Sequence, residues 1–499
     1  MTQVGIIGAG PAGLMLSHLL HRQGIASVVL ERRSRDYVER RVRAGVLEQG
    51  STDLLVATGV GERMIREGLA HDGIKLRFAG EEHRIDFRRL TGRGITVYGQ
   101  QEVIKDLIKQ RLADGGEIWF DAEATGVEGI DGDHPRVAYR RNGEEASLTC
   151  EFVAGCDGSH GVARAGLEAK SYERSYPFSW LGILAKTPPA SNELIYAYHE
   201  RGFALHSMRS PEISRLYLQV DVDDTLDAWP AARIWDELRL RLAEPALQRG
   251  EIIEEGITPM RSLVTEPMQC GRLFLAGDAA HIVPATGAKG MNLALADVKV
   301  LAEALTAWYR SKSRDLLDDY SDRCLRRVWR AEHFSAWMTA LLHRDPAGHC
   351  SPVMRTGMGE KEFLCVLRKT ARRDIVIVVI AASQHIRLVG AAKAHHRLHQ
   401  RVEHRLKVDR RSADDFQHIA SCGELVNRAR EVSLTVAQLI EQPRILDRDH
   451  RLVGEGGYQL DLFACEGFDA CATNGKNADQ RVLAQQGNAD HRAVADHLL

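Results

Sequence analysis

Features that would place a chain in a special class are scarce in these 499 residues. The most apolar run, Ile375 to Ala382, is far shorter than the ~20 residues that a membrane helix needs. Basic residues number 66 and acidic residues 68, so the formal charge of −2 gives neither a basic nucleic-acid footprint nor an acidic tail. The sequence therefore predicts neither a membrane span nor a nucleic-acid partner.

Disulfides and metal sites also find little support. The nine cysteines are odd in number and form no CxxC pair, a pattern that favours reduced thiols over a disulfide framework. His395, His396 and His399 have no convincing carboxylate or cysteine partners at ligand spacing, so we predict no metal site. No secretory signal is visible, because a strand and a Gly-rich turn open the chain. We expect a cytoplasmic protein.

The first 31 residues predict a βαβ unit. A short buried strand, Val4–Ile7, leads into a Gly-rich turn over residues 8–13. The following segment, Leu14–Arg22, carries leucines at helical spacing, and Ser27–Leu30 is a second strand that ends at Glu31. This order of elements is typical of the start of a Rossmann-like domain.

The turn contains a GxGxxG pattern at Gly8, Gly10 and Gly13. Glycines let the backbone approach a pyrophosphate, the helix N-terminus stabilises its charge, and a carboxylate such as Glu31 accepts hydrogen bonds from ribose hydroxyls. Because the strand, the helix and the acidic residue stand in the expected order and spacing, the pattern predicts dinucleotide binding. The alternative is a chance Gly-rich turn. By itself it does not separate FAD from NAD.

Further along, successive strands are expected at 194–198, 203–206 and 215–220, with turn residues between them. They predict an antiparallel sheet inserted into the nucleotide-binding fold. The chain returns to the first domain with a buried strand at 273–276 and continues in helical stretches at 292–311 and 314–342.

The resulting fold class is α/β. We expect a Rossmann-like domain, an inserted, mostly antiparallel β-sheet domain for the substrate, and helices after them. The predicted segments are 1–175 and 271–346 for the nucleotide-binding domain, 176–270 for the substrate domain, and 347–499 for a tail of unknown status.

Two later segments identify the class of cofactor. Gly155–Arg164 resembles the DG motif of FAD-dependent aromatic monooxygenases (class A), and Arg272–His281 resembles their GD motif. The segments 32–50, 97–100, 193–197, 201–205 and 286–290 are similar to the 4-hydroxybenzoate 3-monooxygenase family in particular. The resemblance is nearly continuous from residue 3 to about 346.

The resemblance implies an FAD-binding site, in which the GD acid binds the ribityl chain. A helix starting near Asn292 would point its positive end at the flavin pyrimidine. The implied FAD contacts are Gly8, Gly10, Ala12, Gly13, Glu31, Arg41, Val42, Arg43, Ala44, Gly45, Val46, Gln100, Asp157, Asp278, Gly287, Met291 and Asn292.

The resemblance also places the substrate carboxylate on Arg209, assisted by Ser207 and Tyr217, because a guanidinium forks onto a carboxylate through two charge-assisted bonds. A solvated arginine at the sheet edge is the alternative for Arg209. The remaining implied substrate contacts are Met208, Ala285 and Thr286.

Three residues are expected to favour loss of the substrate's phenol proton. Tyr196 would hydrogen-bond the phenol oxygen, a relay would end at His71, and Lys289 would add positive potential near the ring. Free phenols titrate near pH ~10, so a hydroxylase working at neutral pH needs such help. Without the resemblance, His71 would more simply be a surface histidine.

The implied reaction converts 4-hydroxybenzoate to 3,4-dihydroxybenzoate with NADPH and O2, through a C4a-hydroperoxyflavin. No second nucleotide fingerprint is present, as in this family, where the nicotinamide cofactor docks transiently on the surface. The matching positions are Arg32, Arg33, Tyr37, Arg41, Arg43, His160 and Arg261. Their arginine density favours NADPH over NADH, whereas a solvated basic helix is the alternative for Arg33 and Arg35. The family also implies a homodimer.

Three departures from the family stand out. Ala285 replaces the second proline of the loop after the GD motif, and Tyr198 replaces an asparagine. The family's short helical C-terminus, which carries a second relay tyrosine, has no counterpart after Pro346. We hypothesise that residues 347–499 are no evolved domain but the product of a frame change or a fusion. The alternatives to the proposed activity are a related flavoprotein acting on another phenolic acid and a catalytically impaired flavin-binding remnant.

Overall fold

The computed structural model describes residues 1–78, 80–167 and 169–344, together with the short strands β20 (Arg451–Val453) and β21 (Gln459–Asp461), which pair antiparallel. Residues 1–344 belong to one compact unit, and β20 and β21 belong to a second. The sites discussed below all lie in the first unit.

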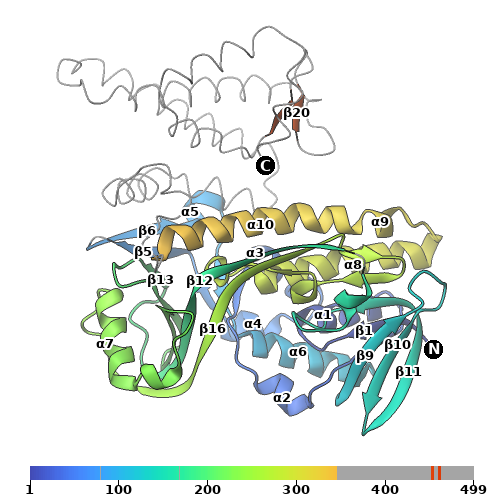
Figure 1. Cartoon of the computed structure of the whole chain (residues 1–499), viewed down its shortest axis with the longest axis horizontal. Helices are drawn as coiled ribbons and strands as arrows, with labels where there is room; N and C mark the ends of the chain where they lie inside the picture. Colours follow the sequence, from blue (N-terminus) through green and yellow to red (C-terminus); the bar gives the residue numbers. More distant parts are fainter. Residues whose placement is uncertain (79, 168, 345–450, 454–458, 462–499) are drawn as a thin grey trace. The chain divides into compact units, whose positions relative to one another are not determined.

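The first sheet has eight strands around a parallel centre, in which β1 lies between β2 and β11 (Figure 1). Helix α1 (Pro11–His21) packs against α6 (Gln100–Ala113) and against α8 (Gly290–Ser311). The strands are β1 (Thr2–Ile7), β2 (Ser27–Leu30), β8 (Glu117–Trp119), β9 (Ala122–Glu128), β10 (Arg136–Arg141), β11 (Glu144–Gly155), β17 (Gln269–Cys270) and β18 (Leu273–Leu275).

The second sheet also has eight strands, in the order β19-β16-β12-β15-β14-β13-β5-β6. All of its pairings are antiparallel except that of β13 with β5. The strands are β5 (Gly73–Phe78), β6 (Glu81–Asp86), β12 (Lys170–Lys186), β13 (Leu194–Ala197), β14 (Ala204–Ser210), β15 (Ile213–Val220), β16 (Glu251–Glu266) and β19 (His281–Ile282).

Helix α7 (Ala231–Arg241) covers one face of this second sheet. Side chains of alternate residues on the strands, including Ile183, Ile195 and Leu216, form a buried cluster with Ile234 and Trp235 of that helix. Because side chains alternate along a strand, the intervening residues point to the opposite face. That opposite face carries the predicted substrate residues.

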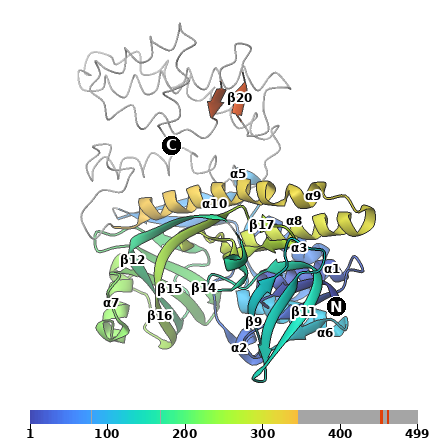
Figure 2. The same ribbon diagram turned by 45° about the vertical axis from the view of Figure 1, so that its right-hand side comes forward.

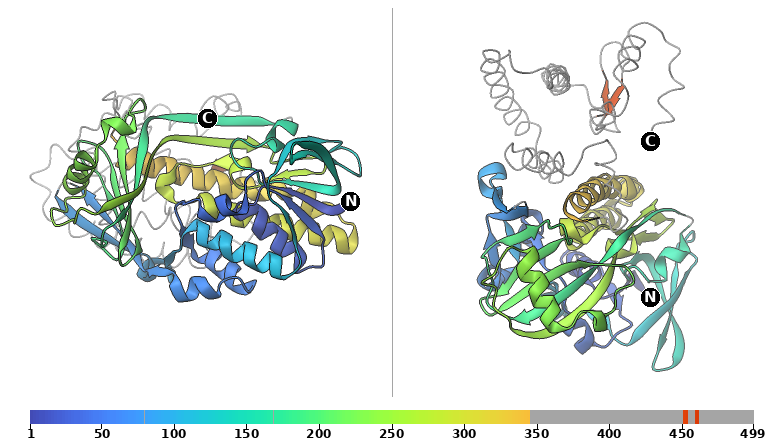
Figure 3. Two further views of the ribbon diagram at one scale, coloured as in Figure 1. Left: turned by 90° about the horizontal axis from the view of Figure 1, so that it is seen from below. Right: turned by 60° about the vertical axis from the view of Figure 1, so that its left-hand side comes forward.

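Strands β12 and β16 pair over nearly their whole lengths and connect the second sheet to the first (Figure 3). The pairing is irregular at two places, between Ser175 and Ser179 and between Leu184 and Ala185. Val264 of β16 belongs to the same buried cluster as β1 and α1, whereas Leu181 of β12 belongs to the α7 cluster. The predicted domain boundaries at 176 and 270 remain predictions.

A small antiparallel sheet, β3-β7-β4, lies beside α3 (Gln49–Ala57) and α4 (Glu62–Glu67). The long helix α10 (Tyr320–Leu342) packs on α8 (Figures 1 and 2). The remaining elements are α2 (Arg35–Arg40), β3 (Val46–Glu48), β4 (Leu69–His71), α5 (Phe87–Thr91), β7 (Ile95–Val97), η1 (Ala163–Gly166), η2 (Leu226–Ala228), η3 (Gly277–Ala279), η4 (Ala285–Gly287) and α9 (Asp315–Asp318).

This architecture confirms the predicted fold class, a Rossmann-like domain with an inserted, mostly antiparallel sheet and helices after it. The expected helix 292–311 begins two residues earlier, at Gly290. The single helix expected over 314–342 is wrong in one detail, because Asp319 separates α9 from α10.

Among the helices that the structure describes, none has the length and apolarity that crossing a bilayer requires. The same part of the chain contains no cluster of histidine, cysteine and acidic side chains that could hold a metal ion. The histidines His395, His396 and His399 and nearly all of the predicted tail 347–499 lie outside the described residues.

Candidate active site

The predicted Gly-rich turn joins β1 to α1. Gly8 has a φ of +103°, and a Cβ there would lie 2.4 Å from the carbonyl oxygen of Cys156. A Cβ on Gly13 would lie 2.0 Å from the carbonyl oxygen of Gly8, so neither position accepts a side chain. At Gly10, by contrast, a Cβ would meet nothing within 4 Å. Gly8 and Gly13 are therefore packed closely against the neighbouring backbone. Gly10 is open, and there a pyrophosphate can approach the backbone.

Helix α1 starts at Pro11, and no side chain caps its N-terminus at Gly10. Its first N–H groups and the positive end of its dipole are thus left for an anion. The Glu31 carboxylate accepts from the backbone N–H groups of Ala9 at 2.8 Å and of Arg33 at 2.9 Å. These bonds hold the acid beside the turn, where a ribose-binding carboxylate is needed.

The expected FAD contacts from Arg41 to Val46 connect α2 to β3. Gly45 packs closely on Tyr98, because a Cβ on Gly45 would lie 2.1 Å from the Tyr98 carbonyl oxygen. The Tyr98 N–H also donates to the Gly45 carbonyl at 2.8 Å. The segment is thereby fixed next to the start of α6, whose first residue is Gln100.

The DG acid, Asp157, follows the end of β11, and its two carboxylate oxygens have different surroundings. Its Oδ2 accepts from the Ala163 N–H at 2.9 Å, whereas Oδ1 is buried without a hydrogen-bond partner among the described residues. Burial raises the pKa of this carboxyl group above its usual range. A buried polar atom without a partner is costly, so Oδ1 fits a site that a ligand completes.

The GD acid, Asp278, lies exposed in η3. The turn requires Gly277, whose φ is +63°. Burial lowers the pKa of the Arg41 guanidinium, and Asp278 is one of the groups that act in the opposite direction. The GD segment and the 41–46 segment are thus close enough in space to interact electrostatically, as a shared cofactor site requires.

The N-terminus of α8 is tied to the small sheet by Asn292. Its Oδ1 accepts from the Glu48 N–H at 2.9 Å and the Ser51 hydroxyl at 2.7 Å, and its Nδ2 donates to the carbonyls of Val46 and Ala288. Four bonds on one amide leave little freedom for the helix end that was expected to face the flavin. Gly287 and Met291 lie in the adjoining residues.

Four predicted substrate and catalytic residues share one face of the second sheet. Tyr196 pairs with Leu205, Leu205 pairs with Tyr217, and Ser207 two residues further pairs with Arg215. Cross-strand partners point to the same face, so Tyr196, Ser207 and Tyr217 lie together opposite α7. The side chain of Met208 alternates to the other face. Arg209 lies at an irregularity in the pairing of β14 with β15, and its guanidinium is close enough to Tyr217 to interact with it electrostatically.

Arg209 carries buried donors that an anion could use. Its Nη2 donates to the Arg43 carbonyl at 2.9 Å, while Nε and Nη1 are buried without a partner among the described residues. Burial lowers the pKa of the guanidinium, with the neighbouring Arg215 acting in the same direction. Arginine nevertheless stays charged at any working pH. A carboxylate could accept from these buried donors, and the alternative of a solvated edge arginine is wrong because the two nitrogens are buried and β14 lies between β13 and β15.

Tyr196 and His71 are both buried, with exposures of 6% and 2%. Burial raises the pKa of the Tyr196 phenol, so this group is neutral and able to donate at working pH. Burial lowers the pKa of His71, opposed by Glu193, and neither ring nitrogen has a hydrogen-bond partner among the described residues. The alternative of a surface histidine is therefore wrong. The structure shows no hydrogen bond from His71 to Tyr196, so the relay remains a prediction.

Lys289, expected to add positive potential, forms an ion pair with Glu48 and lies 5.0 Å from the ring centroid of Phe334. Glu48 therefore screens part of its charge. Thr286 is fully buried and accepts from the Thr339 hydroxyl of α10 at 2.8 Å, whereas Ala285 is exposed. Helix α10 thus holds the loop after the GD motif in place through this hydrogen bond.

The positions expected to contact NADPH are mostly exposed. The Arg33 and Arg41 guanidiniums lie 5.2 Å and 6.0 Å from the ring centroid of Tyr37 and form a cationic surface with it. Arg35 instead pairs with Glu39 at 2.6 Å, as a solvated helix predicts. The other expected contacts lie on three different segments: Arg32 and Arg43 near α2, His160 in the DG segment and Arg261 on β16.

Sequence reasoning missed three groups. Arg215 lies on the substrate face with Nε and Nη1 buried and without hydrogen bonds among the described residues, although Nη1 lies 3.6 Å from the Glu254 carboxylate, and strand alternation with Tyr217 could have indicated it. Glu48 was part of a segment used for the resemblance but received no role. The buried pair of His281 and Asp297 joins positions sixteen residues apart and left no pattern that identifies it.

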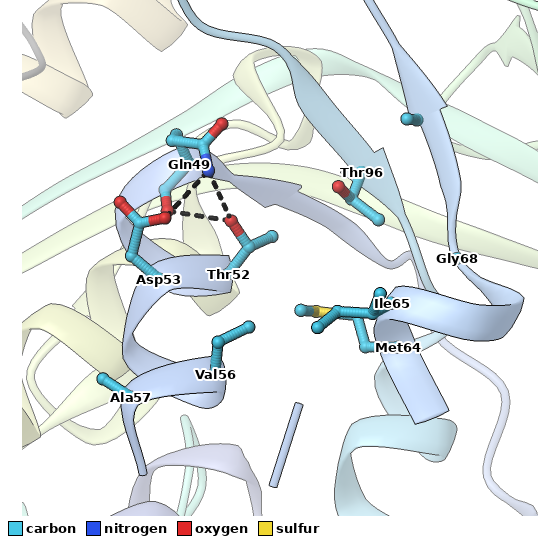
Figure 4. A pocket seen from close by; sticks show the side chains of 10 residues that line it. Gln49, Thr52, Asp53, Val56, Ala57, Met64, Ile65, Gly68 and Thr96 are labelled. Carbon is cyan, nitrogen blue, oxygen red and sulfur yellow. Dashed lines mark hydrogen bonds between the residues drawn. The ribbon is translucent and has the colours of Figure 1, made fainter. Parts of the chain in front are cut away.

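A cleft of about 390 Å³ lies apart from these residues (Figure 4). It is lined by α3, α4 and the outer face of the small sheet, where Thr96 pairs with Ala70. Glu48, Ile95 and His71 occupy the other face, because they alternate with these lining residues. None of the predicted site residues lines this cleft.

Residues 1–335 match the family described as FAD binding domain. The chain is 49% identical over 350 residues to p-hydroxybenzoate hydroxylase of Acinetobacter baylyi, which covers 69% of this chain and 86% of that protein. It is 25% identical to a 3-(3-hydroxy-phenyl)propionate/3-hydroxycinnamic acid hydroxylase of a Mycobacterium species, over 64% of this chain and 56% of that protein.

Solved structures share the fold. The p-nitrophenol 4-monooxygenase of Pseudomonas putida superimposes with a TM-score of 0.66 at 18% identity, covering 78% of this chain and 99% of that chain. Aklavinone-11 hydroxylase, solved with FAD and aklavinone, gives a TM-score of 0.60 at 22% identity, covering 73% and 72%. The chain therefore belongs to the FAD-dependent aromatic monooxygenases, in the family that includes p-hydroxybenzoate hydroxylase.

Proposed function

We propose that this protein hydroxylates 4-hydroxybenzoate to 3,4-dihydroxybenzoate, using NADPH and O2. The overall reaction takes one NADPH, one proton and one O2 for each aromatic acid, and it yields NADP⁺ and one water with the product. One oxygen atom enters the ring carbon next to the phenol oxygen. When bound, FAD supplies acceptance of the hydride and activation of O2.

The observation that carries this proposal is the pair of buried, unpartnered donors on Arg209, on the same sheet face as Tyr196. An aromatic acid has a carboxylate at one end for the guanidinium fork. A para hydroxyl lies at the other end of the ring, where the neutral phenol of Tyr196 can donate to a phenolate oxygen. Ser207 and Tyr217 lie on the same face and assist at the acid end.

The protein's other contribution is to activate the ring electrostatically. Phenolate is far more electron-rich than phenol, so a site that stabilises phenolate favours attack on an electrophilic oxygen. Lys289 supplies positive charge, moderated by Glu48, and His71 is the proposed end of the proton path. Burial of these groups excludes water from the reacting ring.

The deciding experiment is product analysis with the purified protein, FAD, NADPH and O2. We expect 4-hydroxybenzoate to stimulate NADPH oxidation and to yield an equal amount of 3,4-dihydroxybenzoate. A parallel reaction contains 3-(3-hydroxyphenyl)propionate. Product from that acid alone would overturn the proposal in favour of another phenolic-acid hydroxylase, and NADPH oxidation that yields only H2O2 would indicate an impaired flavin-binding remnant.

The preference for NADPH over NADH is proposed from the exposed arginines around Tyr37. A 2′-phosphate gains from such cations, whereas the matching ribose hydroxyl of NADH does not. We expect a lower KM for NADPH, and Arg33→Ser to raise that KM while leaving the KM for NADH nearly unchanged. Equal KM values for the two cofactors would contradict this preference.

A homodimer and a cytoplasmic location complete the proposal. The dimer is proposed from the family, and sedimentation at micromolar concentration tests it. The cytoplasm is proposed because Cys150, Cys156, Cys270 and Cys324 are free thiols in the structure, as expected in a reducing compartment. Cell fractionation with an antibody against the protein tests the location.

A further inference from the structure

A buried ion pair joins the last residue of the GD motif to helix α8. His281 Nε2 and Asp297 Oδ2 are 2.6 Å apart, and their side chains are 1% and 0% exposed. The same Oδ2 accepts from the backbone N–H of Gly277 at 3.1 Å. One carboxylate oxygen of α8 therefore holds both ends of residues 277–281, the GD loop, whose exposed Asp278 was expected to bind the flavin ribityl chain.

The backbone around this loop is held from other sides as well. A Cβ on Gly277 would lie 3.1 Å from the Ala294 Cβ of α8 and 3.5 Å from the Ala12 Cβ of α1. The buried Tyr320 hydroxyl donates to the Leu275 carbonyl at 2.7 Å, just before the loop. The loop is thus confined between the two helices that flank the nucleotide site, and Asp297 supplies its polar attachment.

The charges on and around His281 and Asp297 indicate that this pair positions the GD loop more than it stabilises the fold. Burial by itself lowers the pKa of His281, but Asp297 outweighs it and the pKa is raised, so the imidazole favours its charged form. The other acids that act on it are Asp278 in its own loop and Glu332 of α10. The buried Cys324 thiol also interacts with this carboxylate, and burial together with Asp297 raises the pKa of that thiol. The cost of desolvating a buried ion pair offsets much of its attraction, so the pair adds little net stability.

We propose that His281 and Asp297 are positioning residues for FAD, acting through Asp278. They do not reach the cofactor themselves. They set the place of the GD loop, and with it the carboxylate that binds the ribityl chain. This inference rests on the FAD site alone and holds for any aromatic substrate, so it stands even if 4-hydroxybenzoate is not the substrate.

The test measures FAD affinity of the full-length protein, by quenching of flavin fluorescence on binding to the apoprotein. Asp297→Asn keeps the shape and one acceptor but removes the charge, and we expect the Kd for FAD to rise at least about tenfold. The visible circular dichroism of the bound flavin should also change. Glu303→Gln is the matched control, because Glu303 lies on the same helix and forms only exposed pairs with Lys299 and Arg323. The Kd of Glu303→Gln for FAD should equal that of the unmodified protein.

A double-mutant cycle separates positioning from general support of the fold. If the pair acts through Asp278, then Asp297→Asn should weaken FAD binding strongly alone but hardly further in an Asp278→Ala background. Fully additive losses, or an unchanged Kd for Asp297→Asn, would overturn the proposal. Should Asp297→Asn not fold, His281→Gln keeps a donor at similar reach and completes the same cycle with Asp278→Ala.

Discussion

Arg209 gives the most direct prediction at the scale of single residues. Arg209→Ala should raise the Kd of 4-hydroxybenzoate about 100-fold, or ~3 kcal/mol, because the carboxylate loses its charge-assisted hydrogen bonds to the buried guanidinium. Arg209→Lys should fall between, since an ammonium keeps the charge but not the two parallel bonds. Equilibrium titration of the flavin absorbance measures the Kd.

The control for this prediction is Arg249→Ala. Arg249 belongs to the same sheet domain, but it is exposed and pairs only with Asp236. Its removal should leave the Kd unchanged. If Arg209→Ala binds the acid as tightly as this control does, the assignment of the carboxylate to Arg209 is wrong.

Tyr196→Phe tests the other end of the ring. Burial raises the pKa of Tyr196, so its hydroxyl is a donor throughout the working range. Without this donor, the bound substrate should ionise at higher pH, and kcat at neutral pH should fall about 10- to 100-fold. The ultraviolet spectrum of the bound acid, titrated with pH, reports the phenolate directly.

Tyr172→Phe is the matched control, because Tyr172 of β12 is 41% exposed and its ring contacts Trp329 rather than the substrate face. It should leave the titration of the bound acid unchanged. An identical titration for Tyr196→Phe would show that Tyr196 does not contact the phenol oxygen.

At the scale of elements, the attachment of α8 to the small sheet depends on Asn292. Asn292→Ala leaves the Val46 and Ala288 carbonyls and the Ser51 hydroxyl without their partner. We expect the free energy of unfolding to fall by about 2–3 kcal/mol and FAD binding to weaken. Urea unfolding and FAD titration measure the two effects.

Thr306→Ala provides the comparison within the same helix. The Thr306 hydroxyl donates only to the Ala302 carbonyl of its own helix, so its loss should cost much less. If Asn292→Ala costs no more than Thr306→Ala, the amide does not fix the helix end.

The end of α10 is attached to the second sheet through His343. Its Nε2 accepts from Trp180 Nε1 at 2.7 Å, its Nδ1 lies 3.0 Å from the Thr339 carbonyl, and its ring stacks on Phe203. Because Nε2 accepts, the imidazole is neutral with its proton on Nδ1. Burial lowers the pKa of His343 to about 3.

This lowered pKa predicts a pH dependence with a definite sign. The unfolded chain takes up the proton near pH ~6.5 and the folded chain only near 3, so the stabilisation is complete above about 6.5 and is lost as pH falls. Between pH 7 and 4.5 the loss should be about 2–3 kcal/mol. His343→Phe should lack this part of the dependence in urea unfolding at the two pH values, and an unchanged slope would contradict the assignment.

At the scale of the whole molecule, β12 and β16 run from the α7 cluster to the core beneath the nucleotide site. Two long paired strands that together contribute to both buried clusters favour cooperative unfolding. We expect Trp180 of β12 and Trp229 and Trp235 of the α7 cluster to report the same thermal midpoint as release of the flavin. FAD at 100 times its Kd should stabilise the folded protein by about 2.7 kcal/mol. The thermal midpoint of both signals should therefore rise.

The apoprotein is the control for this expectation. Without FAD, the midpoint of the tryptophan signal should fall by the corresponding amount. Two separated transitions, with only the later or earlier one responding to FAD, would show that the sheet domain unfolds independently.

Local features were predictable wherever short-range chemistry dictates them. The βαβ unit follows from Gly8, Gly13 and Glu31, whose residue types the tight turn and the ribose require. The strands at 194–197 and 213–220 follow from their composition and from the turn residues between them. The split of the last helix at Asp319 was not predictable, because no proline or glycine marks it.

The sequence by itself determined that the chain binds a dinucleotide, because glycines and an acid at fixed spacing serve a nucleotide in only a few ways, and its resemblance to a family in the DG and GD segments indicated FAD and the fold. Only the tertiary structure decided which charges stand alone and which are paired. It left two donors of Arg209 open, placed Glu48 against Lys289, and buried His281 on Asp297. The physical reason is that pairing and burial depend on contacts between segments that are far apart in the chain. Local residue patterns do not show which distant segments come into contact.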